Sequence, residues 1–130
     1  MVILVDHNIE GQGALLWSTL HTDGWLELVP MRLVRFTDVQ LPPTSSDREI
    51  WQFVQAQQML LLTANRNMQG EDSLEQTIRE ANQSTSLPVI TISNVDRMVD
   101  AAYRERCALR LTEIVLYLDH YWGAGRLFIP

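Results

Sequence analysis

The sequence contains no lysine, and all ten of its basic residues are arginine. Without lysine, the protein has no residue that could form a Schiff base or serve as the lysine of a phosphate-binding P-loop. Cys107 is the only cysteine, which excludes an intrachain disulfide and a zinc site made of several cysteines. These absences remove several classes of enzyme and of secreted scaffold.

Long apolar runs are also absent. No stretch approaches the roughly 20 residues that a membrane-spanning helix needs. Met1 is followed by a short apolar run and then Asp6, without the basic segment that opens a signal peptide. We therefore expect a cytoplasmic protein that does not enter a membrane.

The length and the net charge of the chain narrow the number of domains and the possible functions. A chain of 130 residues provides for one hydrophobic core but not for two domains. The formal net charge of −6 at pH 7 argues against a general electrostatic nucleic-acid binder, which normally carries a basic excess. An acidic chain remains compatible with a metal site, because divalent cations bind carboxylates.

Short apolar segments alternate with segments of helical spacing. The first group predicts buried strands at 2–5, 59–63 and 87–92, with weaker strands near 27–35 and 126–129. The second predicts helices at 9–21, at 46–58, from 71 or 72 onward, and over 96–120 as one long helix or a broken pair. This alternation predicts a single α/β domain over residues 1–130, with a central parallel sheet and helices on both faces.

Polar side chains follow two of the predicted strands at the point where each strand ends. Asp6 and Asn8 follow the first strand, and Thr63, Asn65 and Asn67 follow the run of three leucines at 60–62. In open α/β sheets, ligands bind outside the carboxyl ends of the strands. The sequence therefore predicts one polar site built from both strand ends.

Further acids come from the helices that flank this edge. Asp47 opens the second predicted helix, and Glu71, Asp72 and Glu75 surround the start of the third. Each acid has an ordinary structural alternative, such as a helix N-cap for Asp47 or a favourable helix-dipole contact for the later three. We favour a shared site because all these segments meet at one predicted sheet edge, and we expect Asp6 and Asp47 to approach each other without a basic partner between them.

With these residues identified, the chain resembles the PIN ribonuclease superfamily, which includes toxins of bacterial toxin–antitoxin pairs. In that family an aspartate closes the first strand, and a second acid opens a helix in a phrase like the Ser46-Asp47-Arg48-Glu49-Ile50 of this chain. A later strand ends in leucine-leucine-threonine-x-aspartate-x-aspartate, which 61–67 match except for asparagine at both aspartate positions. The resemblance covers roughly residues 1–92.

The resemblance implies a PIN-like fold, Mg²⁺ or Mn²⁺ held by clustered carboxylates, and hydrolysis of RNA phosphodiesters. Under it the partners would be RNA and, for a toxin component, an antitoxin protein. The chemistry is consistent, because a metal-bound water can attack phosphorus while the metal offsets charge on the leaving oxygen. By position, the catalytic acids would be Asp6, Asp47 and Asp72; the metal ligands would be Asp6, Asp47, Asn65, Asp72 and Glu75; and the supporting residues would be Asn8, Thr63, Arg66 and Asn67.

The two asparagines are the departure from the family pattern. The amide oxygen of Asn65 or Asn67 can ligate a metal but brings no negative charge. Either Asp72 or Glu75 supplies the missing charge, or catalysis is weak or lost. Two functions therefore stay open: a metal-dependent ribonuclease, which needs at least three converging carboxylates, and a catalytically impaired PIN-like interaction or regulatory protein.

Two other interpretations depend on less. A receiver-like regulatory domain would share the fold class, but the chain has no lysine to serve a phospho-acceptor site. Trp122 beside Tyr121 is typical of either core packing or a self-association surface, so a homodimer is a further expectation.

Overall fold

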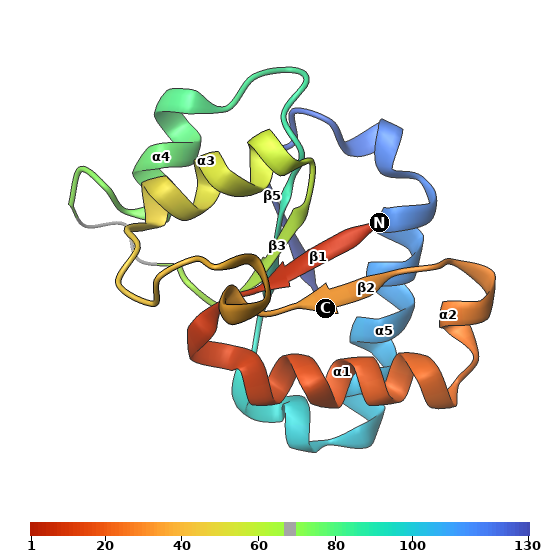
Figure 1. The fold of residues 1–130 in the computed structure, drawn as a ribbon. Coiled ribbons are helices and arrows are strands. Elements are labelled where there is room, and N and C mark those ends of the chain that lie inside the picture. The colour runs from red at the N-terminus through yellow and green to blue at the C-terminus, as the bar shows by residue number, and fades with distance from the viewer. Residues whose placement is uncertain (67–69) are drawn as a thin grey trace.

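Five parallel strands form a single sheet in the computed structural model, which describes residues 1–66 and 70–130 (Figure 1). Their order across the sheet is β2-β1-β3-β4-β5, and each neighbouring pair is parallel. The predicted α/β class with one central sheet is therefore confirmed. The strands are β1 (Val2–Val5), β2 (Arg32–Val34), β3 (Leu60–Thr63), β4 (Val89–Ile92) and β5 (Arg126–Ile129).

The three strands predicted from buried apolar runs are neighbours. Ile3 of β1 pairs with Leu60 of β3, and Leu61 of β3 pairs with Val89 of β4. Every residue of β3 and β4 is buried, as expected for strands covered on both faces. After β1 the chain builds β2 on one side of that strand and then crosses to place β3 on the other side. The β1–β3 boundary is thus a topological switch point, where open α/β sheets bind ligands.

Helices cover both faces of the sheet, as Figure 1 shows. Helices α1 (Glu10–Thr22) and α5 (Ala101–Leu116) pack on one face, and α3 (Asp47–Gln57) and α4 (Leu74–Ala81) pack on the other. Each face has its own hydrophobic cluster, with Leu16 and Leu111 in the first and Ile50 and Leu74 in the second. The remaining elements are the short helix α2 (Trp25–Leu28) and the 3₁₀ turns η1 (His7–Ile9), η2 (Phe36–Val39), η3 (Val95–Val99) and η4 (Leu118–Tyr121).

Two predicted elements differ clearly from the structure. The strand expected near 27–35 is α2 followed by the three-residue β2, because Gly24 takes a left-handed conformation (φ +79°) and starts a helical turn. The third helix begins at Leu74 rather than at 71 or 72, since Ser73 is its N-cap and accepts from the Gln76 amide. The segment 96–120, expected as one long helix or a broken pair, is broken, because Asp100 caps a new helix by accepting from the backbone N–H of Ala102.

Helix α1 approaches β1 closely at Gly13. A Cβ atom at this position would lie 2.8 Å from Cγ2 of Val5, whose side chain is fully buried. Only glycine lets the helix backbone come this near without displacing the strand. The contact fixes the start of α1 beside the carboxyl end of β1, where Asp6 follows.

Of the exposed aromatic side chains, Tyr117 and Trp122 follow α5, and Phe128 lies in β5. Trp122 is 55% exposed, whereas Tyr121 is half-buried and its hydroxyl accepts from Arg110. The self-association surface therefore remains a prediction for Trp122. In the described part of the chain, no helix has the length and apolarity needed to cross a membrane.

Candidate functional site

Asp6 lies at the switch point, directly after β1. Its backbone N–H donates to the Leu62 carbonyl of β3 (2.8 Å). Its carboxylate accepts from the Thr63 hydroxyl at Oδ2 (2.7 Å) and from the Asn8 backbone N–H at Oδ1 (3.2 Å). The second bond caps η1. Asp6 is therefore fixed from both strands, and its carboxylate accepts from the Thr63 hydroxyl and from the Asn8 backbone N–H.

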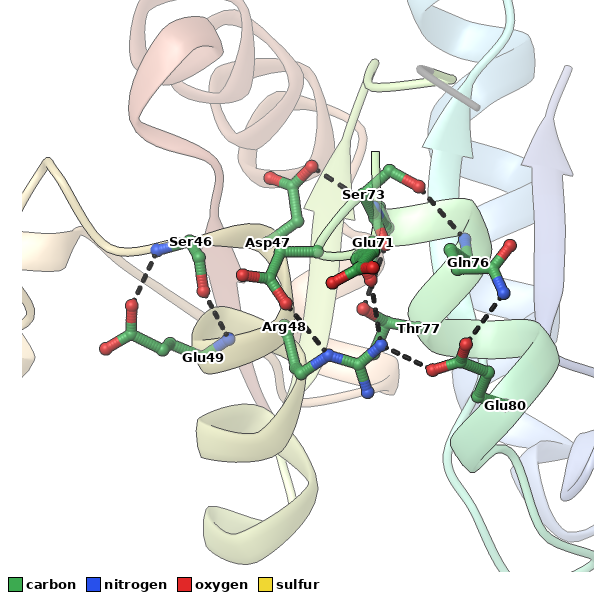
Figure 2. Close-up of polar contacts among 11 residues, drawn as sticks. Ser46, Asp47, Arg48, Glu49, Glu71, Ser73, Gln76, Thr77 and Glu80 are labelled. Atoms are coloured by element: carbon green, nitrogen blue, oxygen red, sulfur yellow. Dashed lines mark hydrogen bonds and ion pairs between the residues drawn. The ribbon is translucent and has the colours of Figure 1, made fainter. Parts of the chain in front are cut away.

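Asp47 reaches the same place from α3. The N-cap of this helix is Ser46, whose side chain forms a reciprocal capping box with Glu49 (Figure 2). Asp47 is thus free of the N-cap role that was its structural alternative. Its Oδ2 instead accepts from the side-chain amide nitrogen of Asn65 (3.0 Å) and from the backbone N–H of Leu74 (3.1 Å). One carboxylate oxygen therefore joins α3 to the loop after β3 and to the first turn of α4.

These residues line a common cavity. Asp6, Asp47, Thr63 and Asn65 surround a space of about 10 Å³ whose remaining walls are Ile50, Leu61 and Leu74. A space of this size holds about one water or one smaller ion. A groove of about 350 Å³ opens beside it and is lined by Asp6, Asn8, Ile9, Ala64 and Asn65. Asp6 and Asn65 border both spaces, so a ligand in the groove would meet the cavity at these two side chains.

The charge of the cavity suits a small cation. Both Asp6 and Asp47 line the cavity, and within the described residues neither forms an ion pair. Carboxylate oxygens are ligands that Mg²⁺ and Mn²⁺ take in proteins, and the cavity presents two carboxylate side chains. Asn65 directs its amide nitrogen toward Asp47, so it would have to turn its amide over to ligate a metal.

Asp72, predicted as a catalytic acid, is placed outside this cavity. Its side chain is 66% exposed and accepts from Arg48 Nε (3.1 Å). Arg48 also donates to Glu80 of α4 (2.6 Å) and to the Glu71 carbonyl (2.9 Å), so its hydrogen bonds connect α3 with α4 (Figure 2). The hydrogen bond to Glu80 raises the pKa of Arg48, and the Asp72 contact adds to this. Asp72 therefore pairs with Arg48 at the surface, and it borders a second groove together with Asp47.

Glu75, predicted as a metal ligand, is also paired elsewhere. Its Oε1 accepts from Arg126 Nε (3.0 Å) and lies 2.9 Å from Arg126 Nη2. Sequence reasoning missed Arg126 as a site-related residue, although it is the single charge at the head of an otherwise apolar terminal strand. That arginine also donates to the Asn65 carbonyl (2.8 Å) and to the Thr91 hydroxyl (2.6 Å).

Two residues remain that were predicted to support the site, Arg66 and Asn67. Arg66 donates to the Ser93 carbonyl directly after β4, and its guanidinium lies 5.3 Å from the centre of the Phe128 ring of β5. Asn67 lies outside the described residues. Across 1–66 and 70–130, no three histidine, cysteine, aspartate or glutamate side chains gather closely enough to hold a metal ion. The third carboxylate that a full nuclease site needs is thus not supplied by the described part of the chain.

Comparisons with models of protein families, with curated proteins and with solved structures gave no match to this chain.

Proposed function

We propose that this protein is a PIN-like domain that holds one divalent cation, Mg²⁺ or Mn²⁺, between Asp6 and Asp47 and binds RNA phosphate there, with impaired hydrolysis. The observation that carries the proposal is the meeting of two carboxylates without ion-pair partners in an ion-sized cavity at the β1–β3 switch point. A cytoplasmic location accords with an RNA ligand.

Each residue at the site has a distinct part in this function. Asp6 and Asp47 would supply the charge and the oxygen ligands for the cation. Thr63 orients Asp6 through its hydroxyl, and Asn65 orients Asp47 through its amide. The cation, when bound, would attract a phosphate oxygen and could lower the pKa of a bound water. The groove beside Asp6 leaves room for a phosphodiester to approach.

The charge count supports impairment of hydrolysis. Asn65 stands where the PIN pattern has an acid, and it contributes no negative charge. The two acids that could have replaced it, Asp72 and Glu75, are paired with Arg48 and Arg126. With two carboxylates in place of three or more, Asp6 and Asp47 would hold a divalent cation less tightly.

An active ribonuclease is the second candidate, and the open groove at Asp6 favours it. Because the groove borders Asp6 and Asn65 directly, an RNA strand would have access to the cation. Under this candidate an antitoxin protein would be the partner that the PIN resemblance implies.

Calorimetric titration with Mn²⁺ tests the proposal. We expect the wild-type protein to bind Mn²⁺, and we expect Asp6→Asn to weaken binding by about tenfold or more, since it removes one of the two charges at the cavity. Asp96→Asn is the matched control, because Asp96 is an exposed acid in η3, and it should bind like the wild type. Absence of Mn²⁺ binding in the wild type, or equal binding by Asp6→Asn, would exclude the cation site.

Incubation with single-stranded RNA separates the two candidates. The impaired domain should retain RNA in a Mn²⁺-dependent manner without cutting it, and Asn65→Asp should tighten Mn²⁺ binding and introduce cleavage. Cleavage by the wild type that Asp6→Asn abolishes would favour the active ribonuclease instead.

A further inference from the structure

We infer that Arg126 is a positioning residue for the candidate site, because it holds the Asn65 backbone in the place from which Asn65 orients both acids. The inference rests on the proposed function for its consequence, but its structural basis is independent of any metal. Arg126 is the first residue of β5, and its side chain is only 9% exposed.

One guanidinium contacts three elements besides its own strand. Nη1 donates to the Asn65 carbonyl in the loop after β3 (2.8 Å) and to the Thr91 hydroxyl of β4 (2.6 Å). Nε donates to Glu75 in the first turn of α4 (3.0 Å). These bonds are charge-assisted and nearly buried, which makes them stronger than neutral bonds at the surface.

Asn65 is the point where this network meets the acids. Its carbonyl accepts from Arg126, its backbone N–H donates to the Thr63 hydroxyl (3.0 Å), and its amide donates to Asp47 (3.0 Å). The Thr63 hydroxyl in turn donates to Asp6. A continuous path of hydrogen bonds therefore leads from Arg126 through Asn65 to both carboxylates of the cavity.

The planar shape of the arginine side chain is needed for this arrangement. Arginine presents several N–H donors in fixed directions, whereas lysine presents a compact charge on a flexible stem. A lysine at position 126 could satisfy one or two of the acceptors but could not fix all three together. We therefore expect Arg126→Lys to retain part of the positioning and Arg126→Gln to lose most of it.

Glu75 has a second role in the same network. A cation beside a metal site would repel the metal, but the carboxylate of Glu75 offsets the charge of Arg126 at 2.9 Å. The pair thereby fixes the Asn65 loop while placing little net charge next to Asp6 and Asp47.

The test uses nuclear magnetic resonance on the metal-free protein, followed by Mn²⁺ titration. Arg126→Gln should shift the side-chain and backbone amide signals of Asn65, speed hydrogen exchange at its backbone N–H, and weaken Mn²⁺ binding by about tenfold, as is usual for residues that orient metal ligands. Arg126→Lys should give intermediate values for all three quantities.

Arg104→Gln is the matched control. Arg104 is half-buried and also donates to a carbonyl, that of Met98 (2.7 Å), and to a hydroxyl, that of Thr19, but it lies among α1, η3 and α5. This variant should leave the Asn65 signals and the Mn²⁺ affinity unchanged.

Different results would refute the positioning role of Arg126 and the proposed function. Unchanged Asn65 signals in both Arg126 variants, or changes equal to those of Arg104→Gln, would overturn the positioning role whether or not Mn²⁺ binds. A wild-type protein that binds no Mn²⁺ while its Asn65 signals still respond to Arg126→Gln would overturn the proposed function and support the positioning role.

Discussion

Replacing Gly13 by alanine is expected to destabilise the protein, although alanine is the better helix former. Gly13 lies in the first turns of α1, and the added methyl group would come 2.8 Å from Cγ2 of Val5. Carbon atoms in contact normally lie about 3.5–4.0 Å apart. Val5 is fully buried and has a short, β-branched side chain, so it cannot swing aside and either the helix or the strand must shift.

Two opposing contributions set the magnitude. Overpacking a well-filled core by one methyl group costs about 1–3 kcal/mol. Replacing glycine by alanine within a helix contributes about 0.5–1 kcal/mol in the stabilising direction. At Gly11, in the same helix, a Cβ atom would meet nothing within 4 Å, so Gly11→Ala should show only the stabilising contribution. The difference between the two variants, about 1–3 kcal/mol, isolates the contact with Val5.

Urea unfolding of the wild type and both variants measures these free energies. The two variants should differ in the midpoint of unfolding while sharing the same dependence on urea, because the surface exposed on unfolding is unchanged. In thermal unfolding the difference corresponds to roughly 4 °C for each kcal/mol in a chain of this size. Equal stability of Gly13→Ala and Gly11→Ala would show that α1 does not press on β1, and the reasoning would be refuted.

Two further predictions concern titratable groups. Hydrogen bonds from Gln76 and then Arg48 hold the pKa of Glu80 below its ordinary value of 4.5, so its contribution to stability is complete above that pH and is lost as the pH falls through the lower pKa of the folded protein. Urea unfolding of Glu80→Gln between pH 6 and roughly 3 should therefore show a smaller loss of stability in acid than the wild type shows. An equal pH dependence of the two proteins would contradict a stabilising role for the hydrogen bonds of Glu80 with Arg48 and Gln76. Burial raises the pKa of the Cys107 thiol to about 11. A thiol reagent at neutral pH should therefore label Cys107 only at the rate at which the protein unfolds. Rapid labelling of the folded protein would contradict the burial of this thiol.

The fold could be predicted where burial alone decides the pattern. Strands β1, β3 and β4 are covered on both faces, and this produces short, continuous apolar runs, which their length and their flanking turn residues distinguish from helices. The edge strand β2 gave no such signal, because Arg32 is exposed and only three residues pair. Its neighbour α2 depends on the left-handed turn at Gly24, which a propensity argument does not specify.

Only part of the candidate site could be predicted from the sequence. Asp6, Thr63 and Asn65 follow from the rule that strand ends meet at one edge, and the structure brings them together with Asp47. The partners of Asp72 and Glu75 could not be foreseen, since each depends on an arginine far along the chain, 24 residues away for Arg48 and 51 for Arg126. Ion pairs between distant segments leave no local pattern in a sequence, so acids that look available can already be occupied.

The position of Arg126 in the chain has a consequence for the order of events during synthesis. The acids of the cavity come from β1 and α3, and Asn65 follows β3, but the arginine that holds the Asn65 carbonyl is 61 residues further on. A chain leaving the ribosome therefore presents Asp6, Asp47 and Asn65 well before the strand that holds the Asn65 carbonyl, and a domain generally folds as a unit. Until β5 joins the sheet, Asp6 and Asp47 would be present without the Arg126 side chain that holds the Asn65 carbonyl. The site would become fully ordered only when β5 has paired with β4, which makes its maturation depend on a segment that is synthesised after both acids.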